Sequence, residues 1–309
     1  MSTAESTVPS TSSTTNRSDP APTKGAPPKE HPRRSWPARI VLLLLCLVWT
    51  VPTLGLLITS VRPQIDTERS GWWSALFNPF ASGWTLQNYR QVLDANGMFD
   101  SFINSIVVTV PATILPIMFA AFAAYAFTFM RFRGRDILFV LIIGLMVVPI
   151  HSTFVSLLQR LGSDGYDING TFLALWLLHT TFGMPLAIYI LRNYMSTLPK
   201  SVIESAEIDG ASHFQTFWRL IVPMSVPALA AYAIFQFLWV WNDLLIALLF
   251  LGFEDATVTV NLSQLLGRLG EGWQLLTAAA FVTMIVPMIV FFALQRFFIR
   301  GMTSGAVKG

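Results

Sequence analysis

The residues that could carry chemistry gather first in a polar stretch between two apolar runs, SVIESAEIDGASHFQTFWRLIVP at positions 201–223. This stretch concentrates acidic side chains, among them Glu204 and Asp209. Ser201 and Glu204 have the S-x-x-E spacing of a capping box, which predicts a helix start. Gly210 suits the left-handed residue that ends a helix. The stretch therefore predicts a short acidic helix that ends in a glycine turn.

The residues after this glycine predict a second, amphipathic helix. Ser212 and Gln215 form an S-x-x-Q box, and we expect Pro223 to end the helical pattern before the next apolar run. The apolar positions recur at i, i+3, i+4 and i+7, which is one helix face: Phe214, Phe217, Trp218 and Ile221. The segment is either an interfacial helix among lipid headgroups or a docking element for a protein partner. The acid favours a protein partner, because basic residues would suit a membrane surface better.

A second polar group lies inside an apolar run. Gln236, Trp239 and Asp243 fall at i, i+3 and i+7, with Trp241 and Asn242 beside them. Amides and carboxylates at membrane depth are costly and normally face protein or a water-filled path. A tryptophan ring also suits the apolar face of a sugar, so these five residues are candidates for a substrate path. Equally, the tryptophans could belong to an aromatic belt and Asp243 to a hydrogen bond between helices.

Other reactive residue types give weaker signals. His151 and His179 lie on different apolar runs without H-x-x-E spacing, which favours structural contacts over a proton relay or a metal pair. Cys46 is the only cysteine, so an intrachain disulfide and a thiolate metal site are excluded. The chain lacks the G-x-x-x-x-G-K-[ST] loop that binds nucleotide phosphates. We therefore expect no catalytic residue, no metal and no cofactor bound by this chain.

The composition indicates that the bilayer is the solvent. Of the 309 residues, 53% are hydrophobic and 12% are charged, whereas soluble domains are about 25% charged. The prediction is an all-α polytopic membrane protein with six transmembrane helices in one domain over 37–300, each helix needing about 20 residues. We expect residues 1–36 to be a disordered tail and residues 301–309 a C-terminal tail. The six apolar segments are Ala38–Val61, Phe102–Phe127, Ile137–Leu158, Thr171–Leu191, Pro227–Leu251 and Leu275–Phe298.

The basic residues predict the orientation. Fifteen of the 20 Lys and Arg residues fall in the N-terminal tail, after the second and fourth segments, and at the C-terminus, and five fall in the opposite loops. By the positive-inside rule both termini and the 201–223 stretch are expected to be cytoplasmic. The net charge of +3 then follows from membrane topology and calls for no nucleic acid partner.

The polar stretch resembles the EAA loop of ATP-binding-cassette (ABC) importer permeases, in which E-A-A is followed by three residues, Gly, nine residues and I-x-L-P. Glu204, Ala206, Gly210 and Pro223 match in register, and Ser205 stands in place of an Ala. Together the segments resemble the carbohydrate permeases of the maltose-transporter type, specifically the MalG-like subunit. The further matching segments are LQNYRQVL (86–93), NSIVVTV…AAYAFTFMRFRGRD (104–136), FGMPLAIYILRNYMSTLPKSVIESAEIDGAS (182–212), WNDLLIAL (241–248) and QRFFIRGMTSGAVKG (295–309).

The resemblance implies a permease subunit of a binding-protein-dependent importer for a sugar or oligosaccharide. Its partners would be a second, MalF-like permease, an extracellular or periplasmic solute-binding protein, and a cytoplasmic ATPase dimer that binds ATP and Mg. The EAA residues Glu204, Ser205, Ala206, Asp209 and Gly210 would couple the permease to the ATPase. The resemblance also implies that the C-terminal tail contacts the ATPase through Gly305, Ala306, Val307 and Lys308, although such a tail is otherwise a frayed end.

Three other functions remain in view. An ion-coupled secondary transporter would carry several ionisable residues inside its spans and internal repeats, neither of which is visible. A membrane-embedded enzyme would need a Ser/His/Asp or metal-ligand constellation, which the spans lack. An ABC permease for a non-sugar solute would keep the EAA loop. The GAVKG ending and FGMPLAIYILRNY favour carbohydrate.

Overall fold

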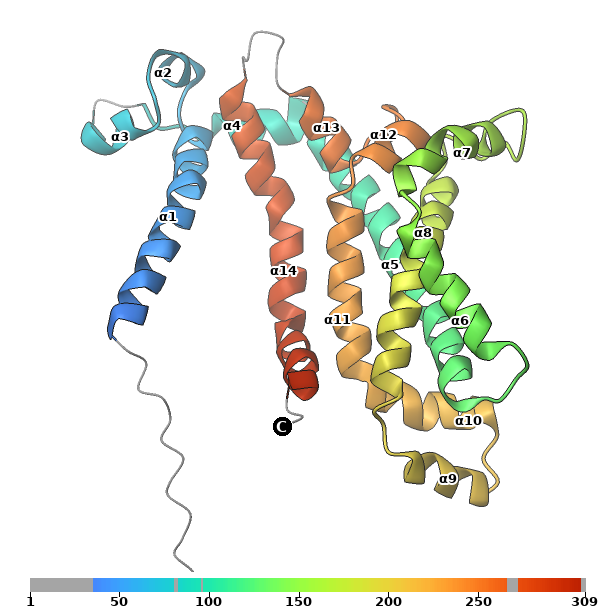
Figure 1. Ribbon diagram of the computed structural model, residues 1–309. Helices are drawn as coiled ribbons and strands as arrows, with labels where there is room; N and C mark the ends of the chain where they lie inside the picture. The colour runs from blue at the N-terminus through green and yellow to red at the C-terminus, as the bar shows by residue number, and fades with distance from the viewer. Residues whose placement is uncertain (1–35, 81–82, 96, 266–271, 307–309) are drawn as a thin grey trace, which may run out of the picture. The chain divides into compact units, whose positions relative to one another are not determined.

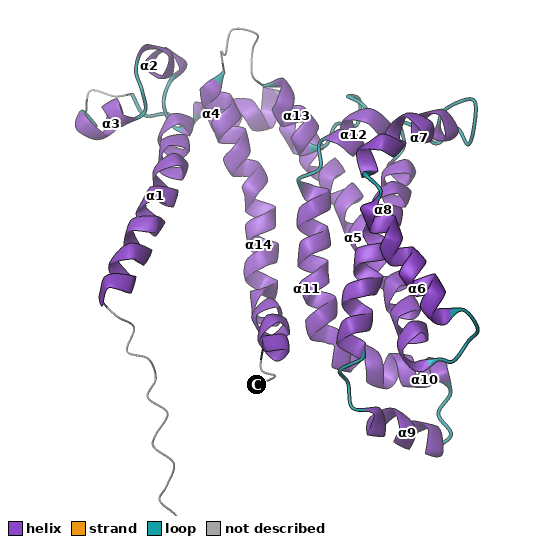
Figure 2. Cartoon of the chain, viewed as in Figure 1, coloured by secondary structure: helices purple, strands orange, loops and turns teal. Residues whose placement is uncertain are grey.

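The computed structural model describes residues 36–80, 83–95, 97–265 and 272–306, and over these ranges it contains helices and loops without any strand (Figure 2). The predicted tail, apart from Trp36, lies outside them. Contacts divide the chain into two units, Met1–Thr50 and Val51–Gly309. In the first unit, the described residues form the apolar first part of α1 (Trp36–Ser60). The remaining elements belong to the second unit, and the all-α fold is confirmed.

Five helices are long and apolar enough to cross a membrane, and a bent pair of shorter helices brings the number to six within the described residues. Four of the five correspond to predicted segments: α1, α5 (Met98–Phe129), α8 (Phe172–Met195) and α14 (Trp273–Ala306). The shorter helices are α2 (Gln64–Arg69), α3 (Trp73–Phe77), α4 (Gln87–Arg90), α6 (Arg135–Gly144), α7 (Phe154–Leu161), α9 (Lys200–Ile208), α12 (Leu245–Phe250) and α13 (Val258–Gln264). Figure 1 shows α9 and α10 (His213–Thr216) at one end of the long helices and α7, α12 and α13 at the other.

The third predicted segment is broken. Instead of one helix over Ile137–Leu158, α6 and a 3-10 turn end at Val147, and the chain resumes in a second 3-10 turn and α7 after a bend of 89°. Pro149 causes the break, because it has no N–H to donate and forces the preceding residue out of the helical region. Val148 accordingly has ψ of 122°. The prediction of one continuous helix here is wrong.

The fifth predicted segment has different ends. A continuous helix runs from His213 through α10, a π-helical turn (Phe217–Ile221) and α11 (Val222–Trp241), and it ends ten residues before the predicted Leu251. Pro223 lies within this helix, so the prediction that Pro223 ends it is also wrong. The π turn explains why the helix tolerates Pro223. Val222 donates to the carbonyl of Phe217, five residues back, so the pattern of backbone hydrogen bonds shifts just before the proline removes a donor.

The core of the second unit lies between α5 and α8. Alanines line the contact, with Ala120 and Ala124 of α5 and Ala187 of α8 all completely buried. Small side chains let two helix backbones approach closely, which is how helices associate in lipid, where burial of apolar surface supplies no drive. Large apolar side chains on the same helices, such as Phe119 and Ile114 of α5, are about half exposed. The sequence thus places small residues at helix contacts and large ones toward lipid.

Candidate functional site

The acidic helix α9 begins one residue earlier than its predicted cap. Pro199 occupies the N-cap position with an extended backbone (φ −62°, ψ 119°), and no side chain caps the helix. Ser201 is therefore inside the helix, where its carbonyl accepts the Ser205 hydroxyl at 2.8 Å. The predicted capping box between Ser201 and Glu204 is wrong. Proline displaces it because its fixed φ and missing N–H suit a helix entrance, where an amide has no partner.

The glycine turn after α9 is confirmed. Gly210 has φ of +76°, and its amide donates to the carbonyl of Glu207 at 3.0 Å. The amide of Ala211 donates to the carbonyl of Ala206 at 2.9 Å. These two bonds form a Schellman motif around Asp209 as C-cap. The turn holds the end of α9 in one geometry, and only glycine adopts this φ without strain.

The predicted coupling residues do not share one environment. Glu204, Ser205, Asp209 and Gly210 are exposed, whereas Ala206 is 8% exposed and faces the chain's own core, as Ile203 does. α9 thus rests on Ile203 and Ala206 and presents its acids to solvent. A partner that docks on α9 would meet the four exposed residues and not Ala206.

A groove of about 760 Å³ runs between α9 and the ends of α5 and α8. Two acids of α9, Glu204 and Glu207, line one part of it. Four basic residues line it as well: Arg131, Arg135, Arg192 and Lys200. Among the described residues no ion pair joins these acids to these bases. Arg135 instead pairs with its neighbour Asp136 at 3.2 Å. The carboxylate of Glu204 is therefore available to a cationic partner.

The second part of the polar stretch starts as predicted. Ser212 and Gln215 form a capping box, with Gln215 N donating to the serine hydroxyl at 3.3 Å and Ser212 N donating to Oε1 of Gln215 at 2.9 Å. Two contacts, which sequence reasoning missed, then tie this segment to α5. Phe217 stacks on Phe122 with ring centroids 4.5 Å apart, and the Tyr125 hydroxyl lies 3.0 Å from Nδ1 of His213. The start of the helix that continues into α11 is therefore packed directly against α5.

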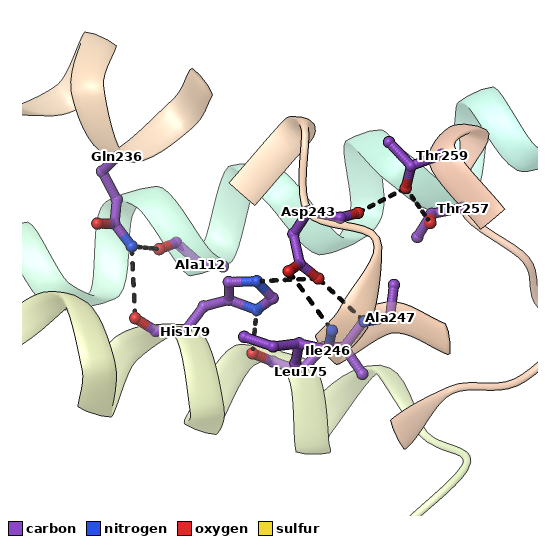
Figure 3. Close-up of polar contacts among 9 residues, drawn as sticks. All are labelled: Ala112, Leu175, His179, Gln236, Asp243, Ile246, Ala247, Thr257 and Thr259. Atoms are coloured by element: carbon purple, nitrogen blue, oxygen red, sulfur yellow. Dashed lines mark hydrogen bonds and ion pairs between the residues drawn. The ribbon is translucent and has the colours of Figure 1, made fainter. Parts of the chain in front are cut away.

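The predicted substrate-path residues also separate. Gln236 is completely buried, and its Nε2 donates to the carbonyls of Ala112 at 3.1 Å and His179 at 3.4 Å (Figure 3). The Tyr232 hydroxyl lies 2.8 Å from Oε1 of Gln236. Gly183 makes room for this amide, since a Cβ there would lie 2.7 Å from Oε1. Gln236 thus links α5, α8 and α11.

Asp243 follows the end of α11 and does not continue the predicted helix face. Its carboxylate accepts the amides of Ile246 at 3.4 Å and Ala247 at 3.0 Å, so it satisfies two free amides in the first turn of α12. Figure 3 also shows its contact with His179 of α8, whose Nε2 lies 3.7 Å from Oδ2. Asn242 donates back to the carbonyl of Leu238 at 2.7 Å. The Asn–Asp pair ends one helix and begins another, which explains why the predicted span stops here.

The remaining candidates differ in exposure. Trp239 is half-buried and packs edge-on against the ring of His179, with centroids 5.3 Å apart. Trp241 is 3% exposed and donates its indole N–H to the carbonyl of Thr283 in α14 at 3.2 Å. His151 is exposed, and its ring packs edge-on against that of Phe154 with centroids 5.3 Å apart. Across the described residues, no three His, Cys, Asp or Glu side chains form a group that could hold a metal ion.

Comparison with known proteins identifies the family. Residues 114–304 match the model of the binding-protein-dependent transport system inner membrane component. The chain is 50% identical to the osmoprotective compounds uptake permease protein GgtD of Synechocystis sp., over 88% of this chain and 92% of that protein. It is 38% identical to the alpha-glucoside transport system permease protein AglG of Rhizobium meliloti, over 91% of this chain and 99% of that protein.

A solved structure shows the same fold. It is a bacterial ABC transporter involved in the import of the acidic polysaccharide alginate, and a chain of it superimposes with a TM-score of 0.67 at 19% identity. The match covers 85% of this chain and 98% of that chain. Because the family model covers more than half of the sequence and both relatives match over nearly their full length, this chain belongs to the binding-protein-dependent transport system inner membrane components, the multi-pass permeases of ABC importers.

Proposed function

We propose that this permease imports a small neutral sugar derivative, such as an α-glucoside. The single observation that carries the proposal is an apolar cavity of about 400 Å³ with no charged residue in its lining. It lies between the broken third span, α8 and α11. The name of one relative, for alpha-glucosides, agrees with a neutral glycoside.

The chemistry of the cavity suits a sugar better than a charged solute. Trp239 and Phe235 supply aromatic rings, Thr181 supplies a hydroxyl, and Tyr232 and Gln236 line the cavity with neutral groups that are bonded to each other. An amino acid or an acidic oligosaccharide would bring charge that finds no counter-ion here, and an unpaired charge is costly to bury. We infer that Trp239 contacts the solute and that Gln236 lines the path with its buried amide. Asn242 is exposed at the end of α11, and we place it at the mouth of the path.

The proposed partners follow from the family. A second permease would complete the path, a solute-binding protein would deliver the sugar, and an ATPase dimer that binds ATP and Mg would drive alternating access. The exposed residues Glu204, Ser205, Asp209 and Gly210 would form the ATPase contact, with Ala206 supporting them from below. This proposal is supported by the free carboxylate of Glu204 and by the rigid turn at Gly210.

The C-terminal residues are a further proposed ATPase contact. Gly305 and Ala306 are the last residues of α14, while Val307 and Lys308 lie outside the described residues. The helix therefore continues past the predicted domain boundary at residue 300. We retain the division into a tail over 1–36, a transmembrane domain over 37–300 and a C-terminal segment over 301–309 as a proposal.

The orientation is also a proposal. Arg131 and Arg135 share the groove with Glu204, so the basic loop after α5 lies at the same end of the long helices as α9. By the positive-inside rule that end is cytoplasmic, and both termini are assigned to the same side.

Purified importer in nanodiscs, with its ATPase and solute-binding protein, tests the function directly. ATP hydrolysis is measured with maltose, trehalose and melibiose, and with a zwitterionic amino acid and an anionic alginate oligosaccharide as charged comparisons. We expect at least one neutral sugar to stimulate ATP hydrolysis. Trp239→Ala should lose this stimulation, and Leu249→Ala, a substitution of an exposed residue, should keep it as the control. Stimulation by the amino acid or alginate alone would refute the proposal.

A further inference from the structure

Each proline inside a long helix leaves a backbone carbonyl without its helical donor, and among the described residues such prolines are Pro52, Pro111, Pro116, Pro185, Pro227 and Pro287. Proline has no N–H, so the carbonyl four residues before it loses its bond. In α5, Pro111 frees the carbonyl of Val107 and Pro116 frees that of Ala112. In α14, Pro287 frees the carbonyl of Thr283. Inside a membrane such a group is costly unless another donor reaches it.

A side-chain N–H from a neighbouring helix reaches each of these three carbonyls. The indole of Trp176 in α8 donates to Val107 at 2.9 Å. The amide of Gln236 in α11 donates to Ala112 at 3.1 Å, which Figure 3 shows. The indole of Trp241, the last residue of α11, donates to Thr283 at 3.2 Å.

Three of these proline positions are paired in this way, whereas among the described residues no side chain of another helix donates to the carbonyls that Pro52, Pro185 and Pro227 free. Among the described residues, six hydrogen bonds run from a side chain of one long helix to a backbone carbonyl within another. Three of the six end on a carbonyl that lies four residues before a proline. The donors are two tryptophans and a glutamine, which have only a planar N–H group in common. The feature shared by the three acceptors is a carbonyl freed by a proline.

We propose that Trp176, Gln236 and Trp241 are positioning residues that lock the proline hinges of α5 and α14 onto α8 and α11. A proline position is where a helix bends most easily. A donor fixed to the freed carbonyl sets the direction of that bend and ties it to the donor's helix. α11 then carries α5 and α14 with it as one body when the α9 turn moves.

The route from the turn to these hinges is continuous. The helix that contains Gln236 and Trp241 starts at His213, three residues after Gly210. Displacement of the turn therefore reaches both donors through one unbroken helix. This inference is independent of which solute is carried, because none of its bonds involves the solute, and it fails or holds separately from the proposed substrate class.

A double-mutant cycle tests each pair on the full-length protein in detergent. Trp176→Phe keeps the ring and removes the N–H, and Pro111→Ala restores the backbone donor to Val107. We expect Trp176→Phe to lower the thermal midpoint in the wild-type background and to lower it much less in the Pro111→Ala background. If Trp176→Phe alone is not recovered from membranes, its recovery together with Pro111→Ala supports the proposal, and continued absence overturns it.

The other two pairs follow the same design, with Gln236→Met against Pro116→Ala and Trp241→Phe against Pro287→Ala. Trp49→Phe is the matched control, because this indole is 77% exposed and has no hydrogen bond among the described residues. Equal losses in the two backgrounds, or losses no larger than that of the control, would overturn the proposal.

The joint movement is tested in the assembled complex. Spin labels on Val226→Cys in α11 and Ile285→Cys in α14, in a Cys46→Ser background, report the distance between the helices; both sites are exposed. We expect one narrow distribution with and without ATP. Trp241→Phe should broaden it, and the addition of Pro287→Ala should restore it. A distance that changes with ATP in the otherwise unaltered protein would show that the helices do not move together.

Discussion

Gly210→Ala isolates the backbone conformation of the turn after α9. An added Cβ would meet no atom within 4 Å, so it adds no steric clash. The cost is that of the left-handed conformation at φ +76°, about 1–2 kcal/mol for an L-residue with a side chain. That cost lowers the equilibrium constant between the native turn and its unfolded alternatives by a factor of roughly 5–30. We expect solute uptake to fall accordingly, while the amount of permease in the membrane stays unchanged.

Gly210→Pro extends the series, because proline fixes φ near −65° and removes the amide that donates to Glu207. Uptake should then be lost. Gly170→Ala is the matched control: Gly170 has φ of +83°, again with no atom within 4 Å of an added Cβ, but it lies in the loop before α8, at the opposite end from α9. Equal uptake in Gly210→Ala and Gly170→Ala, or normal uptake in Gly210→Pro, would refute a coupling role for the turn.

Three further predictions concern single contacts. Glu204→Lys should weaken ATPase binding by about 1.5–3 kcal/mol; co-purification of the ATPase at wild-type yield would show that this carboxylate is not an anchor. Ser212→Ala removes the capping box and should cost about 1 kcal/mol, seen as a lower thermal midpoint, so an unchanged midpoint contradicts it. In a Cys46→Ser background, Trp239→Cys should react with a water-soluble thiol reagent faster than the buried Trp241→Cys; equal rates would place the solute path elsewhere.

Part of the local turn chemistry could be predicted from the sequence, although the Ser201–Glu204 box was wrong. Gly210 and the Ser212–Gln215 box act over three or four residues, so their neighbours along the chain determine them. The apolar runs likewise predicted the long helices, because lipid requires each crossing to satisfy its own backbone.

Whether a proline breaks a helix or lies inside one could not be predicted from the sequence alone. Pro149 breaks a helix and bends the chain by 89°, whereas Pro223 lies inside a continuous helix. The difference depends on the π turn before Pro223, and a π turn has no simple sequence signal. The orientation of Gln236 was equally hidden, because its partner Ala112 is 124 residues away and helical periodicity says nothing about which helix a face meets.

The break at Pro149 also bears on how the chain enters the membrane during synthesis. α6 and its following turn reach from Arg135 to Val147, about 20 Å at 1.5 Å per residue, which is shorter than the roughly 30 Å hydrocarbon core. This segment is too short to be retained by itself as a crossing when it leaves the insertion machinery. Its stable insertion requires α8, which follows it in the chain and packs against it. Substitutions on the α6-facing side of α8 should therefore lower the yield of inserted protein and expose it to quality-control proteolysis.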